Sequence, residues 1–276
     1  MYDKYELKER LREIKNNDFR SPDDISIFDF TLNMIEYIGD PDPDLRDNLI
    51  YEVLDRWIMD GMFGTDQLSK LLNIIFDSSH LFYKIGEEGT DSVFTRSFSV
   101  LIVADIIYYY RIHNTGLEED LRNIKEKLIK YMSEEKDVRG YISGKGWAHS
   151  AAHTGDALNE LVQCRYMKYK DLLEIMEAVK KKIFINSYAY ISGEDERLTT
   201  PIVSIIDRKI LGNKDIVDWI RSFKNINKIS KYPEDMNLEV NVRNFLRSVY
   251  FRLLYKDNYD EINGAIKETL YNIKKF

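Results

Sequence analysis

Apolar residues recur at three- and four-residue spacing along almost the whole chain, and no convincing run alternates apolar with polar residues. The first pattern is typical of amphipathic helices and the second of half-buried strands. The sequence therefore predicts an all-α fold. We expect helices over residues 3–16, 22–38, 43–60, 66–77, 90–113, 117–135, 146–164, 169–186, 194–210, 213–225, 234–256 and 259–274.

Residues that begin and end helices accompany this pattern. "SPDD" from Ser21 and "DPDL" from Asp42 each place an N-cap side chain before a proline and acidic residues, a favourable first turn. "SGED" from Ser192 has the spacing of a capping box, with aspartate in place of the usual glutamate. Gly61 follows a predicted helix and suits the left-handed backbone that often ends one. These residues indicate where several helices begin or end.

The spacing of the predicted helices indicates how they stack. Their starts fall roughly every 20–25 residues, so helix pairs recur about every 45 residues, as in HEAT arrays. Short connections between long helices imply antiparallel neighbours. We therefore expect an α-α superhelix, a HEAT- or armadillo-like stack of about 12 antiparallel helices; a closed α/α toroid is the alternative. Because no linker or low-complexity segment divides the chain, we expect residues 1–276 to form a single domain.

Composition narrows the class of protein. The chain is 44% apolar and 32% charged, which is typical of soluble globular proteins, and its net charge of −7 provides no basic footprint for nucleic acid. Cys164 is the single cysteine, and the charged start "MYDKYELKER" is unlike a signal peptide, so we expect a cytoplasmic protein. The longest apolar run, Phe98 to Tyr110, is too short for a bilayer and contains Asp105, which predicts a buried core helix and no membrane partner.

The segment "GKGWAHSAAHTGDALNELVQ" contains two of the four histidines of the chain. At 100° per residue, His149, His153, Asp156 and Glu160 form one narrow polar stripe, and Trp147 lies on the opposite, apolar side. Such a stripe is either solvated surface or the polar wall of a superhelix groove, where ligands bind. Both interpretations remain open from the sequence.

Metal binding is the most specific interpretation of this stripe. Two histidines at i and i+4 can reach one divalent ion, and Asp156 can add an oxygen ligand, so His149, His153 and Asp156 are the candidate metal ligands. "HSAAH" lacks the catalytic glutamate of the zincin motif, because Ser150 occupies that position. Asp156 can also orient the ring of His153 for acid–base chemistry. No other cofactor is expected, since the loop around Lys145 lacks the spacing of a nucleotide P-loop.

Arg96 lies on an otherwise apolar helical stripe. A buried charge without a partner costs several kcal/mol, so this arginine needs one. We favour a structural ion pair. The alternative is an anchor for an anion at a groove wall, because the guanidinium group suits bidentate contacts.

Two further segments place charges beside apolar positions. "GEDERL" puts Glu194 and Asp195 in a first helical turn, where they either cap the helix or balance a cation, and Arg197 follows. "NVRNFLRSVYFRLL" places Arg243 and Arg247 one turn apart as a cationic edge on a core helix. Charges that interrupt apolar faces tend to mark a functional site or a buried network.

Four segments resemble the bacterial domain-of-unknown-function family 2785: "DSVFTRSFSVLI" from Asp91, "RGYISGKGWAHSAAHTGDALNELV" from Arg139, "GEDERL" from Gly193 and "NVRNFLRSVYFRL" from Asn241. The resemblance extends from about residue 80 and implies an all-helical soluble protein, without indicating an activity. Gly155 stands where we expect alanine, with no obvious consequence. The resemblance implies that the residues to test are Arg96, Trp147, His149, His153, Asp156, Glu194, Asp195, Arg197, Arg243 and Arg247.

These observations favour a binding scaffold. We expect a polar groove of histidine, arginine and acidic side chains that holds a small ligand, a peptide or a partner protein. The alternative is a metal-dependent or histidine-assisted hydrolase that uses His149, His153 and Asp156. Both require side chains distant in sequence to meet in one cavity.

Overall fold

The computed structural model of the chain describes residues 2–114, 116, 118 and 120–273. Its elements are α1 (Lys4–Asn16), α2 (Ile27–Glu36), α3 (Pro43–Leu45), the π-helix η1 (Arg46–Tyr51), α4 (Glu52–Met59), α5 (Thr65–Ile75), α6 (Ser92–His113), α7 (Asp120–Glu134), β1 (Tyr141–Ile142), β2 (Gly146–Trp147), α8 (Ser150–Gln163), α9 (Tyr169–Ile183), α10 (Glu194–Asp207), α11 (Asn213–Arg221), the 3-10 helix η2 (Ser222–Lys224), α12 (Glu234–Leu254) and α13 (Asp260–Ile273).

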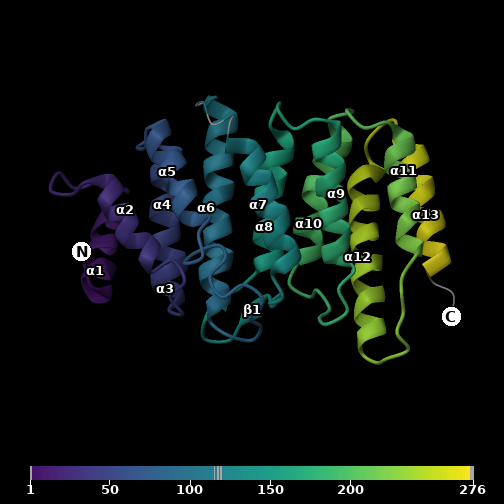
Figure 1. Cartoon of the computed structure of the whole chain (residues 1–276), viewed down its shortest axis with the longest axis horizontal. Helices are drawn as coiled ribbons and strands as arrows, with labels where there is room; N and C mark the ends of the chain where they lie inside the picture. Colours follow the sequence, from purple (N-terminus) through teal and green to yellow (C-terminus); the bar gives the residue numbers. More distant parts are fainter. Residues whose placement is uncertain (1, 115, 117, 119, 274–276) are drawn as a thin grey trace.

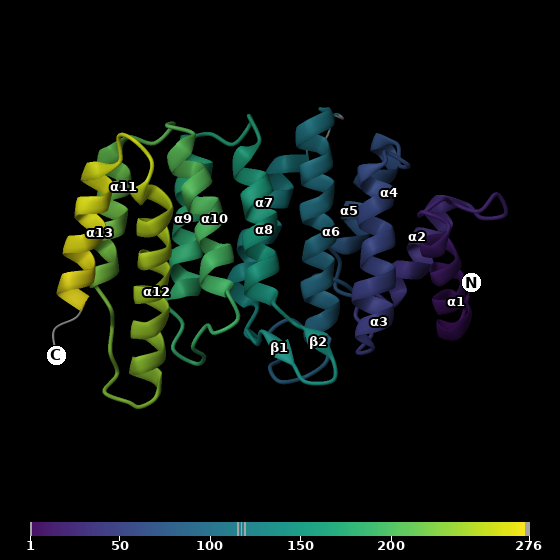
Figure 2. The same cartoon turned by 180° about the vertical axis from the view of Figure 1, so that it is seen from behind.

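The helices stack side by side along one axis (Figures 1 and 2). Helices α4, α6, α8, α10 and α12 contact one another in succession and form one layer, whereas α7 and α9 contact each other and pack against it. The predicted all-α superhelix is therefore confirmed. The toroid alternative is wrong, because α1 and α13 lie at opposite ends of an open array in both views.

One apolar cluster extends from Leu7 to Ile273 and joins the amphipathic faces of successive helices. Helix α6 is long and apolar enough to cross a bilayer by length and composition, but most of it is buried inside the fold. This burial agrees with its prediction as a core helix. Since α6 contacts helices on both sides, it lies where a polar side chain must find a partner or a cavity.

The capping residues in the sequence predicted some helix boundaries correctly and others incorrectly. Asp42 caps α3 by accepting a hydrogen bond from a backbone N–H of the first turn, and Gly61 takes a positive φ after α4, as predicted. Ser21 does not cap α2, which begins five residues later than expected with Ser26 as its cap. Helix α10 is preceded by Gly193 in a left-handed conformation, so Ser192 is not the cap. The predicted helix ends at 117 and 274 lie outside the described residues.

The largest error concerns residues 146–149, which we expected to be helical. Gly146 and Trp147 instead form β2, which pairs antiparallel with β1. His149 then adopts a left-handed backbone, with φ of 46°, and α8 begins at the next residue. Hence Trp147 is not on α8, and its predicted position on the apolar side of that helix is wrong.

Candidate functional site

The β1–β2 hairpin positions Trp147 over the start of α8. Arg46 donates a hydrogen bond from Nη2 to the carbonyl oxygen of Lys145 at 2.6 Å, and the amine of Lys145 pairs with Asp91 at 2.7 Å. These contacts hold the hairpin against η1 and the start of α6. The Trp147 ring consequently stacks on His149, with ring centroids 4.2 Å apart and ring planes inclined by 23°.

His149 lies in a mostly buried position between the hairpin and the start of α10. Its Nε2 is 3.2 Å from the carbonyl oxygen of Ser192 and 3.7 Å from Oε1 of Glu194, a fully buried carboxyl. Burial, and next the charge of Arg197, lower the pKa of His149 to about 4. The ring is therefore neutral at neutral pH and donates from Nε2 to Ser192.

His153 continues this aromatic cluster one turn along α8. Its ring meets His149 and Phe98 edge to face, at centroid distances of 5.7 and 5.5 Å, and its Nδ1 is 3.1 Å from the carbonyl oxygen of Ser97. Burial, and next the proximity of His149, lower the pKa of His153 to about 3. Both histidines are thus buried neutral rings and not the solvated surface that one interpretation of the stripe predicted.

The acidic residues of the stripe are held by arginines from neighbouring helices. Asp156 forms a bidentate pair with Arg197 of α10, in which Nε lies 2.5 Å from Oδ1. Glu160 accepts a hydrogen bond at 3.0 Å from Nε of Arg111 on α6. Since Arg197 engages Asp156, and Ser97 engages the ring nitrogen of His153, the expected orientation of His153 by Asp156 does not occur.

Beyond the Asp156–Arg197 pair, the layer of α4, α6, α8 and α10 contains a cavity of about 410 Å³. The end of η1 also contributes to its wall, through Tyr51, and four of the lining side chains are carboxylic acids. We call this cavity the acidic pocket. Its polar lining consists of Tyr51, Asp55, Asp105, Asp156, Asn159, Glu160 and Arg197.

Asp105 is the most buried acid of the acidic pocket, with 9% of its surface exposed. Its Oδ1 lies 3.4 Å from the hydroxyl of Tyr51, and its Oδ2 has no hydrogen-bond partner among the described residues. Burial, and next the negative charge of Asp55, raise the pKa of Asp105 well above its usual value. In the described part of the chain, neither Asp105 nor Asp55 is paired with a cation, in contrast to Asp156 and Glu160.

Comparison with known proteins assigns the chain to a family. Residues 81–251 match the family described as "Protein of unknown function (DUF2785)". The chain belongs to the DUF2785 family. No curated protein and no solved structure matches this DUF2785 protein. The matched range contains α6, the hairpin, α8 and α10, and therefore most of the acidic pocket, whereas Tyr51 and Asp55 precede it.

In this DUF2785 protein, Arg96 lies apart from the acidic pocket. Its guanidinium group is fully buried and pairs with Glu135, at 2.5 and 2.9 Å, and also donates to backbone carbonyls of residues 83, 84 and 87. These contacts support the structural ion pair that we favoured. Asp105 follows Arg96 by nine residues, or two and a half helical turns, so the two charges point to opposite sides of α6.

The remaining site residues predicted from the sequence lie in different parts of the structure. Glu194 joins Trp147, His149 and His153, where its Oε2 accepts a hydrogen bond from the backbone N–H of Ser192 at 2.9 Å. Asp195 is partly buried beside it. Arg243 and Arg247 on α12 do not line the acidic pocket, and Arg247 is exposed. Instead, Arg252 of α12 reaches α10, where it pairs with Glu196 at 3.0 Å.

The candidate metal ligands do not assemble into one ligand set. Among the described residues, no group of three or more histidine, cysteine, aspartate or glutamate side chains is arranged to hold a metal ion. His149 and His153 direct ring nitrogens to backbone carbonyls, and Asp156 is engaged by Arg197. Burial and arginine pairing, neither visible in the helical wheel, account for this outcome.

Sequence reasoning missed most of the residues that line the acidic pocket, including both of its unpaired acids. Asp105 carried a signal, because it is a lone acid within the apolar run of α6, but we used it only to argue against a membrane segment. Tyr51 and Asp55 lie in a part of the sequence with no distinguishing motif. Only the packing of α4, and of the adjoining end of η1, against α6 brings them to Asp105.

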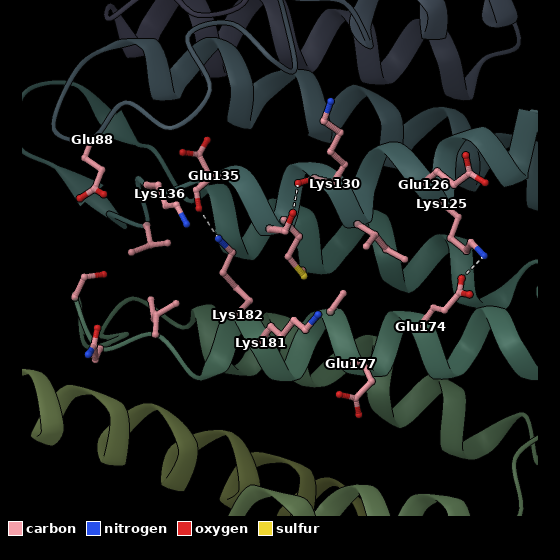
Figure 3. Close-up of a pocket in the computed structure, with 18 of the residues that line it drawn as sticks. Glu88, Lys125, Glu126, Lys130, Glu135, Lys136, Glu174, Glu177, Lys181 and Lys182 are labelled. Atoms are coloured by element: carbon pink, nitrogen blue, oxygen red, sulfur yellow. Dashed lines mark hydrogen bonds and ion pairs between the residues drawn. The ribbon is translucent and has the colours of Figure 1, made fainter. Parts of the chain in front are cut away.

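A second cavity, of about 930 Å³, lies between α7 and α9. We call it the α7–α9 groove (Figure 3). Its floor is apolar, with Ile129, Met132, Leu173 and Ile185, and its rim carries lysines and glutamates. None of the ten candidates from the sequence lines this groove.

Proposed function

We propose that this DUF2785 protein is a binding scaffold that holds an organic cation, presented as an ammonium or guanidinium group, in the acidic pocket. The supporting observation is the carboxyl group of Asp105, which is buried, lines the cavity and leaves Oδ2 without a partner among the described residues. An unpaired buried carboxylate is unfavourable, and a bound cation would supply its missing counter-charge.

The contrast between the acids of the acidic pocket supports this choice of ligand. Arg197 and Arg111 compensate Asp156 and Glu160, so these acids fix the wall and offer little net attraction. Asp105 and Asp55 remain for the ligand. An ammonium group between them would gain two charge-assisted hydrogen bonds, which are stronger than neutral ones.

The apolar part of the lining fits the carbon skeleton of such a ligand. Met59, Leu101 and Ala104 provide hydrocarbon surface beside the acids, and Tyr108 adds an aromatic ring. Cations bind favourably to the faces of aromatic rings. A volume of about 410 Å³ accommodates a cationic head with several attached carbons but not a folded domain.

The test is calorimetric titration of the full chain with butylammonium, guanidinium and a short lysine-containing peptide, with 1-butanol as the uncharged counterpart of butylammonium. We expect the cations to bind and butanol not to bind. Asp105→Asn should weaken binding at least about tenfold, since it removes one partner of a buried charge pair. Asp23→Asn, which makes the same charge change at an exposed position, should leave binding unchanged.

The outcomes separate the sources of the cation. Tighter binding of the peptide than of butylammonium would identify a lysine side chain of a partner as the ligand, and the reverse would identify a free amine. Equal binding by the wild type and Asp105→Asn would contradict the proposal.

The hydrolase alternative receives less support from the same geometry. Acid–base chemistry requires a histidine that exchanges protons near neutral pH and reaches a substrate. Burial keeps His149 and His153 neutral, with pKa values of about 4 and 3, and backbone carbonyls hold their rings. We therefore favour binding over hydrolysis.

A further inference from the structure

The α7–α9 groove contains a buried amine that the proposed function does not use. Lys182 extends from α9 toward the end of α7 (Figure 3) and is 5% exposed. Its Nζ donates one hydrogen bond, 2.7 Å long, to the backbone carbonyl oxygen of Glu135. The carboxylate of Glu135 is turned to Arg96 instead, so Lys182 forms no ion pair within the described residues.

The surroundings of Lys182 disfavour its charged form. The pKa of Lys182 is lowered to about 8. Burial is the main cause, the ammonium of Lys136 acts in the same direction, and the carboxylate of Glu135 opposes both. The other charged groups at this part of the rim, Glu88 and Lys181, are exposed to solvent. A desolvated lysine beside a second cation is an arrangement that activates amines as nucleophiles.

We propose that Lys182 is a covalent site at which an apolar aldehyde or ketone, bound in the α7–α9 groove, forms an imine. The uncharged amine attacks the carbonyl carbon, so that a C–N bond forms and the carbonyl π bond breaks to give a carbinolamine. One proton of the amine passes to the former carbonyl oxygen and makes the hydroxyl group of the carbinolamine. Loss of that hydroxyl group with the remaining N–H proton, as one water molecule, leaves the C=N bond. No oxidant or reductant is required.

The geometry fits each part of this step. The single hydrogen bond to Glu135 uses one N–H of the neutral amine and leaves the nitrogen lone pair free for attack. Met132 and Ile185 supply hydrocarbon surface for the body of the carbonyl compound. Burial also removes water, which favours the imine over the hydrolysed pair.

The test uses the full chain, with hexanal as the probe and sodium cyanoborohydride to reduce any imine in place, followed by peptide mapping by mass spectrometry. We expect Lys182 to be alkylated at least about tenfold faster than the adjacent exposed Lys181 at pH 7, because more of it is uncharged. The rate at Lys182 should rise with pH to a midpoint near 8. Glyoxylate, an acidic aldehyde without an apolar body, should label Lys182 more slowly than hexanal.

Two variants on the rim provide a matched comparison. Lys136→Met removes the cation that acts on Lys182, so the pKa of Lys182 should rise and its labelling at pH 7 should slow severalfold. Lys181→Met makes the same charge change on the same rim but should leave the rate at Lys182 unchanged. Both positions are exposed, which makes misfolding a poor explanation of a difference.

Equal labelling of Lys182 and Lys181 in the wild type would overturn the proposal and leave Lys182 as a cap for the end of α7. An unchanged pH midpoint in Lys136→Met would contradict the role of Lys136. The inference is independent of the acidic pocket, so neither experiment decides the other.

Discussion

At the scale of single residues, the fold treats buried polar groups in three ways. Arg96 and Glu135 are charged and bind each other. His149 and His153 are neutral and bind backbone carbonyls. Asp105 has one carboxyl oxygen without a hydrogen-bond partner among the described residues. The first two arrangements satisfy their groups within the protein. The third leaves an acceptor without a partner among the described residues, and the cation that we propose would supply one.

Asp105→Asn should make the unliganded protein more stable at pH 8. Because burial raises the pKa of Asp105 above its unfolded value, the folded state holds that proton more tightly, and stability is lost as pH rises through the ionisation of Asp105. The variant avoids this loss, so its melting temperature should exceed that of the wild type by a few degrees, about 2–4 °C per kcal/mol. Scanning calorimetry from pH 4 to 8 should show the difference grow with pH. A variant less stable than the wild type at pH 8 would make Asp105 a structural partner.

The buried histidines should make the protein sensitive to mild acid. Their pKa values are lowered to about 4 and 3, so below pH 6.5 the unfolded chain takes up protons that the folded chain refuses. The free energy of unfolding should fall by up to about 1.4 kcal/mol per pH unit for each histidine. Urea denaturation at several pH values between 7 and 5 gives the free energy of unfolding as a function of pH. This free energy should fall less steeply with decreasing pH in His153→Phe than in the wild type, and an equal fall in both proteins would refute this account.

At the scale of elements, close approach of α8 and α10 positions the site. A Cβ atom at Gly155 would lie 2.8 Å from the backbone oxygen of Arg197, so a glycine is needed where the two helices cross. The departure from alanine in the family segment therefore has a consequence that the sequence did not reveal. It allows Arg197 to reach Asp156 and close the wall of the acidic pocket.

Gly155→Ala should destabilise the protein, although alanine favours helices over glycine by about 1 kcal/mol. Overpacking against a backbone atom costs about 1–3 kcal/mol and should outweigh that gain. Gly264 in α13 is the matched control, because an added Cβ there meets no atom within 4 Å of the described structure. Gly264→Ala should stabilise by about 0.5–1 kcal/mol in urea denaturation. Stabilisation by both substitutions would show that α8 and α10 can separate freely.

At the scale of the whole molecule, the stacking of helices brings together residues that are far apart in the sequence. The acidic pocket takes residues from the end of η1 and from α4, α6, α8 and α10, and these residues extend from Tyr51 to Arg197 in the sequence. In a superhelix each helix contacts mainly its neighbours. A ligand in the acidic pocket would therefore contact four helices that are adjacent in one layer and stabilise them jointly.

Binding of butylammonium should therefore slow hydrogen exchange in all four of these helices at once. We expect slower exchange in α4, α6, α8 and α10 and unchanged exchange in α11 and α13, which lie away from the acidic pocket. Hydrogen exchange read by mass spectrometry, with and without the ligand, makes the comparison. Protection confined to one helix would place the ligand elsewhere.

The sequence predicted the helices well because three- and four-residue periodicity is a local property repeated along every element. It failed at Trp147, since a hairpin of a few residues with an apolar tryptophan resembles the start of a helix. It identified Arg96 as a charge in need of a partner but could not identify Glu135, because that choice depends on how α6 and α7 pack. The burial of His149 and the opening beside Asp105 have the same tertiary origin.

Helix α6 presents a cation toward the end of α7 and, half a turn around its axis, an acid toward the acidic pocket. A helix rotated by 180° about its axis would turn Arg96 away from Glu135 and leave its buried guanidinium group without acceptors. The cost of a buried arginine without a partner strongly disfavours that alternative. The Arg96–Glu135 pair thus fixes how α6 is rotated about its own axis, and that rotation directs Asp105 to the acidic pocket.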